Sequence, residues 1–74
     1  MDNGTQLTAR AMQTIQAEFE EKTWQAFRQT AVDGLSAAEV SHRIGLSTGA
    51  IYVAKSRVLA RLKVEVERLQ AEEE

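Results

Sequence analysis

Residues 36–48, SAAEVSHRIGLST, contain two helix starts separated by one helix stop. Ser36 and Glu39 form a capping box, in which the serine hydroxyl accepts a hydrogen bond from the amide three residues on and Glu39 reaches back to the amide of Ser36. Gly45 ends the helix that begins there, because glycine readily adopts the left-handed backbone of a helix C-terminus. Ser47 is a second cap. The stretch therefore predicts a short helix, a tight turn and a further helix.

Beyond this turn, apolar residues recur at intervals of three, four or seven almost to the end of the chain, as on one face of a helix. The pattern predicts a last helix of more than about 20 residues, or about 30 Å at 1.5 Å per residue. Its expected buried stripe consists of Ile51, Ala54, Val58 and Leu62, continued by Val66 and Leu69.

Two more helices are expected before the turn. A first helix over about residues 6–19 follows from apolar residues every four positions: Leu7, Ala11, Ile15 and Phe19. A second helix over about residues 20–33 ends at Asp33-Gly34. The side that it is expected to bury carries Trp24, Phe27, Ala31 and Val32.

Composition agrees with an all-helical chain. The 74 residues include no proline and many good helix formers. We expect an all-α fold: a four-helix bundle with a C-terminal helix-turn-helix and a long last helix. Residues 1–5 are expected to be a flexible N-terminus, residues 6–70 one helical domain with its helix-turn-helix at 36–62, and residues 71–74 an acidic tail.

The sequence lacks the residues that several classes of function require. There is no cysteine and only one histidine, so neither a disulfide nor a metal site is expected. No apolar run approaches the ~18 residues of a membrane span, and the start MDNGTQ lacks the regions of a signal peptide, so a cytoplasmic protein is expected. We find no nucleophile–base pair and no phosphate-binding glycine loop, and we expect neither an enzyme nor a cofactor.

The open side of the last helix carries an unusual set of groups. Gly49 lies in its first turn at a cost of up to ~1 kcal/mol of helix propensity, which predicts close approach of another surface there, either DNA or a neighbouring helix. Opposite the buried stripe lie hydroxyls, a phenol, a methyl-bearing side chain and cations, which suit base edges and phosphates. These residues are Thr48, Tyr52, Val53 and Ser56, with Lys55 and Arg57 nearer the edges. The alternative for Tyr52 is a ring that lies against an adjacent helix.

The charge of the chain is polarised. Its net charge of −2 is unlike that of a free-standing DNA-binding domain. All eleven acidic residues nevertheless lie outside the window from Ser41 to Lys63. That window holds five cations, and the positive region coincides with the turn and the start of the last helix. The five are Arg43, Lys55, Arg57, Arg61 and Lys63.

Residues 33–62, DGLSAAEVSHRIGLSTGAIYVAKSRVLARL, resemble the C-terminal region four of bacterial sigma factors of the extracytoplasmic-function branch. The likeness lies in the order GLS, two residues, Glu, a short helix, IG, Ser and a basic helix. Residues 19–32 look like the preceding helix in a Trp-containing subset of the family. The resemblance implies a winged-helix-like architecture without a wing. It also implies three partners: double-stranded promoter DNA at the −35 element, the β-subunit flap of RNA polymerase core, and an anti-sigma factor.

The family pattern carries over residue by residue. Residues 47–50 match the helix start that approaches phosphates, and Arg57 matches a commonly basic position. Tyr52 and Val53 depart from the pattern, because many members have a basic residue followed by serine there. No region two is present, so promoter melting is expected to need other segments. The expected DNA-binding residues are Arg43, Ser47, Thr48, Gly49, Tyr52, Val53, Lys55, Ser56 and Arg57.

Two alternatives remain open from the sequence. The first is a LuxR-type response-regulator domain whose last helix dimerises through Val58, Leu62, Val66 and Leu69. The second is a helical protein–protein interaction module. A concentration-dependent dimer without promoter binding would favour either of them.

Overall fold

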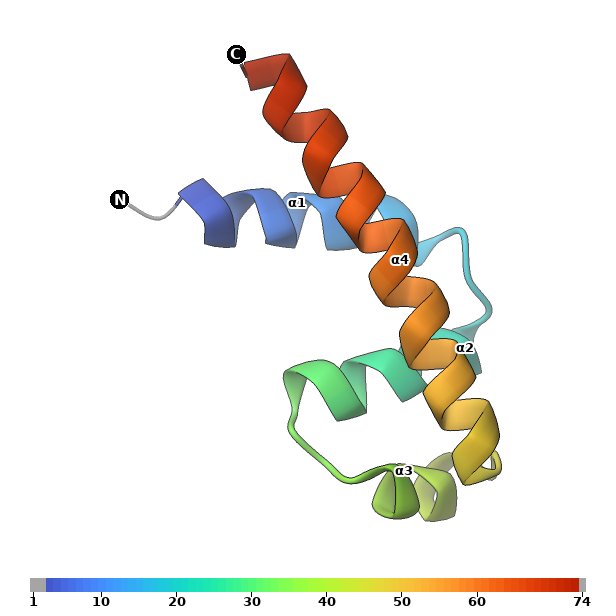
Figure 1. Ribbon diagram of the computed structural model, residues 1–74. Coiled ribbons are helices and arrows are strands. Elements are labelled where there is room, and N and C mark those ends of the chain that lie inside the picture. The colour runs from blue at the N-terminus through green and yellow to red at the C-terminus, as the bar shows by residue number, and fades with distance from the viewer. Residues whose placement is uncertain (1–2, 74) are drawn as a thin grey trace.

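The computed structural model describes residues 3–73, and this part of the chain is all-α. Within it lie four α-helices, one π-helical segment and no strand. In chain order they are α1 (Asn3–Gln16), α2 (Glu21–Phe27), η1 (Arg28–Val32), α3 (Ala37–Ile44) and α4 (Thr48–Glu73) (Figure 1).

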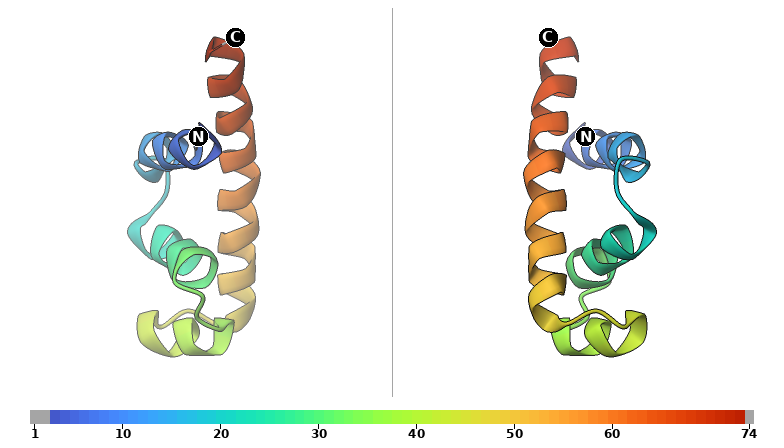
Figure 2. Two further views of the ribbon diagram at one scale, coloured as in Figure 1. Left: turned by 90° about the vertical axis from the view of Figure 1, so that its left-hand side faces the viewer. Right: turned by 90° about the vertical axis from the view of Figure 1, so that its right-hand side faces the viewer.

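Helix α4 is the spine of the molecule. Its 26 residues span about 39 Å at 1.5 Å per residue, close to the longest extent of the molecule, 42 Å. The three shorter helices lie one after another along a single side of α4, and the other side is bare (Figure 2). The three shorter helices therefore pack against one side of α4, and the four helices do not surround a common axis as in the expected bundle.

The buried residues form three groups along α4. The first, near the start of α4, joins Ala26, Val40, Ile51 and Ala54. The second, at the level of α2, joins Ile15, Trp24, Phe27 and Val58, with the Trp24 and Phe27 ring centroids 5.3 Å apart. The third, where α1 crosses the second half of α4, joins Leu7, Ala11 and Leu69. The predicted stripe on α4 is confirmed, with Leu62 partly buried between the second and third groups.

The predicted buried side of the second helix is only half right. Trp24 and Phe27 are buried, but Ala31 is exposed and Val32 is 55% exposed. The reason is tertiary, because η1 leads away from α4 and no helix of residues 3–73 covers Val32 (Figure 1). The buried residue that the pattern missed is Ala26, which faces the group around Val40.

The helix ends follow the predicted turn chemistry, except that Glu39 does not accept the hydrogen bond from the Ser36 N–H that the capping box predicts. The Glu39 N–H donates to Ser36 Oγ at 3.1 Å, which confirms the serine cap. Gly34 and Gly45 both have φ of +76°, the left-handed conformation that makes glycine the suitable residue at each stop.

The limits of the first and last helices differ from the expected ones. Helix α1 already includes residues 3–5 and ends at Gln16, followed by tight turns in which Glu18 N–H donates to the Ile15 carbonyl at 2.9 Å. Phe19 lies beyond α1 and is half-buried. Helix α4 continues through residues 71–73 of the acidic tail. Residues 1–2 and 74 lie outside the described part.

Candidate nucleic-acid interface

The turn between α3 and α4 is held by its own side chains. The Ser41 hydroxyl donates to the Leu46 carbonyl, which braces the end of α3 against the turn. Ser47 Oγ accepts from the Ala50 N–H at 3.1 Å, and the Ile51 N–H donates to the Ser47 carbonyl at 3.0 Å. Leu46 packs against the group around Ile51. The start of α4 is thus capped and anchored at a defined position beside α3.

The structure places the nine expected contact residues on the surface. Tyr52 is 62% exposed and Val53 is 56% exposed. Lys55 is half-buried, and the others are exposed: Arg43, Ser47, Thr48, Gly49, Ser56 and Arg57. The exposure of Tyr52 excludes the alternative in which its ring is covered by an adjacent helix within residues 3–73.

Side chains on the first three turns of α4 form adjacent rows. Gly49, Val53 and Arg57 are spaced four residues apart and share one row. Tyr52 lies in the neighbouring row. Lys55 and Arg57 are about 160° apart around the helix, since each residue advances about 100°. The two cations therefore flank the face that carries Tyr52 and Val53. A helix in a major groove has phosphates on both sides, and this spacing of cations matches them.

Gly49 has no packing role within the described residues. A Cβ atom added there would meet only Ser47 Oγ, at 4.0 Å. The alternative that a neighbouring helix needs the glycine is therefore wrong for residues 3–73. The site is open to solvent and leaves room for a partner to approach the backbone closely.

Arg61 does not belong to the open positive surface. Its Nε donates to Glu18 Oε1 at 2.8 Å and its Nη2 to Glu18 Oε2 at 2.9 Å, a two-pronged ion pair that ties α4 to the segment after α1. Its Nη1 donates to Glu65 Oε1 at 3.2 Å. Four cations of the predicted positive window remain without an ion pair to any described residue, namely Arg43, Lys55, Arg57 and Lys63.

Glu65 is a buried carboxylate that the apolar pattern of α4 did not predict. Its side chain is 2% exposed and lies on the buried side of α4. Hydrogen bonds from Arg68 and then from Arg61 lower the pKa of Glu65 below its ordinary value, and they outweigh the opposing effect of desolvation. The local pattern missed this residue because a glutamate among charged neighbours resembles a surface position. Its spacing of four from Arg61 and three from Arg68 was the available signal.

The structure also locates the dimer seam considered for a LuxR-type domain. Val58 has no exposed surface and Leu69 is 6% exposed, covered by α1 and α2. Leu62 and Val66 are partly buried in the same core groups. Those four side chains are engaged within the chain, so a dimer through them would require α1 and α2 to leave.

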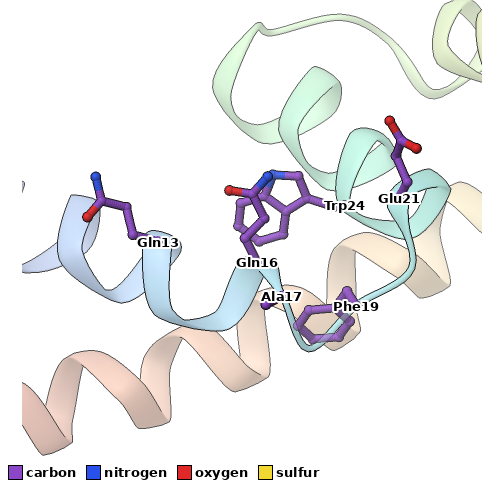
Figure 3. A pocket seen from close by; sticks show the side chains of 6 residues that line it. All are labelled: Gln13, Gln16, Ala17, Phe19, Glu21 and Trp24. Carbon is purple, nitrogen blue, oxygen red and sulfur yellow. The ribbon is translucent and has the colours of Figure 1, made fainter.

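A second surface feature lies where α1 and α2 meet. It is an open hollow of about 400 Å³. Gln13 and Gln16 come from α1, Glu21 and Trp24 from α2, and Phe19 from the link between them (Figure 3). Trp24 is 8% exposed, which confirms it as a core residue, and it also lines the hollow.

Residues 3–73 contain neither a metal-ligand cluster nor a membrane-spanning helix. No three His, Cys, Asp or Glu side chains gather there as a metal ion would require. No helix there combines the length and apolar character needed to cross a membrane. No protein-family model matches the chain, and comparison with curated proteins and with solved structures finds no match either.

Proposed function

We propose that this chain is a DNA-binding module in which α3 and α4 form a helix-turn-helix and the first three turns of α4 enter the major groove. The observation that carries the proposal is the exposed face of Tyr52 and Val53, flanked on its two edges by Lys55 and Arg57. Phosphate contacts from the cations would position the helix, and the side chains between them would meet base edges.

The resemblance of residues 33–62 extends this proposal to transcription initiation. The chain would act in the cytoplasm as region four of an extracytoplasmic-function sigma factor and read the −35 promoter element. The β-subunit flap of RNA polymerase and an anti-sigma factor would be its protein partners. Tethering through polymerase would raise the local concentration of a module whose own affinity for DNA is low.

Salt titration of DNA binding tests the proposal and counts the phosphate contacts. Duplexes selected from a randomised pool would be titrated by fluorescence anisotropy. With about three to five contacts, log K should fall against log salt with a slope of roughly −3 to −4.5. Absence of binding to any selected duplex at low salt contradicts the proposal.

Two arginines on the same helix provide a matched comparison. Arg57→Ala should weaken binding and reduce the salt slope by about 0.9, since one phosphate contact is lost. It should change the free energy of unfolding by less than about 0.5 kcal/mol, because Arg57 is exposed and away from caps and core. Arg61→Ala should leave the slope unchanged and lower the melting temperature, because it breaks the ion pairs to Glu18 and Glu65. A slope change at Arg61 but not at Arg57 would mean that the wrong surface is assigned.

The hollow beside Trp24 favours a second candidate, a helical protein–protein interaction module. Its open shape and its lining of two aromatic residues and two glutamines suit a protein side chain or helix better than a phosphate backbone. A variant such as Gln16→Arg should impair this function and leave DNA binding intact. Hydrogen exchange distinguishes the two candidate functions. A DNA partner should protect the start of α4 from exchange, and a protein partner should protect the hollow beside Trp24.

A further inference from the structure

One side of α4 is left bare by the other helices (Figure 2). Opposite the buried stripe, the exposed residues of α4 form a second heptad pattern. Its residues recur at alternating intervals of four and three, the spacing with which two helices pack together. All of them are exposed, and Val53 and Val64 are 56% and 57% exposed. We call this row the outer seam: Val53, Arg57, Ala60, Val64, Glu67 and Ala71.

The outer seam is complementary to itself when two copies run antiparallel. If Ala60 of one copy faces Val64 of the partner subunit, Arg57 faces the partner's Glu67 and Glu67 faces the partner's Arg57. One ion pair then lies on each side of the central contacts between Ala60 and Val64. In a parallel, in-register pair each charge would instead face its own like, which is unfavourable. The sequence of the seam thus selects both the occupant and its direction.

We infer that the outer seam is a self-association surface, occupied by α4 of a second copy of this chain in antiparallel orientation. Formation of this dimer does not depend on the proposed DNA binding. Val53 and Arg57 belong to both surfaces, however, so one copy cannot use them for the seam and for DNA at once. Self-association would then store the chain in a form that does not bind DNA.

The composition of the seam predicts a weak dimer. Ala60 and Ala71 permit close approach, but Val53 and Val64 are its only large apolar side chains. The two copies of Lys63 lie beside the symmetry axis and repel. A single helix pair of this kind covers less than the roughly 1,600 Å² of a typical stable complex. A dissociation constant in the micromolar to millimolar range follows, and dilution would release monomers.

Sedimentation equilibrium of the whole chain tests the pairing through charge reversal. Arg57→Glu and Glu67→Arg should each raise the dissociation constant by about tenfold or more, because each creates two like-charge contacts. The double variant R57E/E67R should restore dimerisation, because opposite charges again face each other at positions 57 and 67 of the two copies. In a parallel dimer the like charges would still face each other, so the double variant would restore nothing. Lys22→Glu is the control for Arg57→Glu, since it makes the same change in net charge on an exposed site of α2. Circular dichroism would verify that each variant is folded.

Cysteine cross-linking tests the direction, because the chain has no cysteine of its own. A mixture of V53C and A71C chains should form a mixed disulfide. V53C alone should not cross-link, since the two positions lie 18 residues, or about 27 Å, apart in the antiparallel pair, beyond the reach of a disulfide. A chain that stays monomeric up to millimolar concentration, a dimer indifferent to Arg57→Glu, or self-linking of V53C would overturn the inference.

Discussion

At the residue scale, two glycines four positions apart have opposite physical roles. Gly45 has φ of +76° and ends α3, where a side chain would strain the backbone. Gly49 lies inside α4, where a Cβ atom would meet nothing closer than 4.0 Å. The first glycine stabilises the fold, and the second weakens the helix in which it lies.

Alanine substitution should separate these roles. Gly49→Ala should raise the free energy of unfolding by up to about 1 kcal/mol, the difference in helix propensity. Gly45→Ala should lower it by about 1–2 kcal/mol through left-handed strain. Thermal melting measures both. If DNA approaches the start of α4 closely, Gly49→Ala should also weaken DNA binding while it stabilises the fold. A destabilised Gly49→Ala chain would contradict the open surroundings of that residue.

At the element scale, α3 is a helix of only eight residues and depends on its ends. Such a short helix is marginal in isolation, so capping and packing must maintain it. Ser36 caps its start, and Gly45 with the Ser41 hydroxyl closes its end. Val40 is its only fully buried residue. The helical state of α3 therefore relies on hydrogen bonds at both termini, and its position against α4 relies on the packing of Val40 with Ile51 and Ala54.

Loss of the cap should be measurable against a matched serine. Ser36→Ala should cost about 1 kcal/mol of stability, since the Glu39 N–H loses its acceptor. Ser56→Ala, at an exposed position within α4, should change stability by less than about 0.5 kcal/mol. Urea unfolding followed by circular dichroism would compare them. Equal effects of the two substitutions would contradict the assigned start of α3.

At the scale of the whole molecule, a chain of ion pairs runs along the second half of α4. Arg61 forms ion pairs with Glu18 and Glu65, and Arg68 forms ion pairs with Glu65 and Glu72. The network raises the pKa of both arginines, for Arg61 chiefly through the hydrogen bond to Glu18. It fastens α4 to the region around α1, on the half of the molecule away from the candidate interface.

Acid should therefore loosen this half of the molecule. The pKa of Glu65 is lowered by folding from an ordinary value of 4.5, so its stabilisation is fully present above that pH and is lost as the pH falls through the folded-state pKa. The melting temperature should fall accordingly on acidification below pH 4.5. Glu65→Gln should have a lower melting temperature at neutral pH and a shallower acid dependence. The exposed Glu67→Gln should retain the full dependence, and identical pH profiles for the two variants would argue against a structural role of Glu65.

Much of the helical architecture was accessible from local patterns. The caps, the glycine stops and the buried stripe of α4 depend on interactions within a few residues, and such spacing is visible in a linear chain. The outward direction of Tyr52 followed from the same periodicity. The resemblance to a sigma region four and the DNA contacts of the nine residues stay predictions.

The sequence by itself determined the helices, their caps and which face of α4 is apolar, because these follow from backbone conformation and periodicity over a few turns. Only the tertiary structure decided that Glu65 is buried, that Arg61 is bound to Glu18 and that Val32 is exposed. Those outcomes depend on where α1 crosses α4 and where η1 leads, and the Arg61 and Glu18 partners are 43 residues apart. Contacts between residues so distant in the chain form only when the helices pack, so no local pattern contains them.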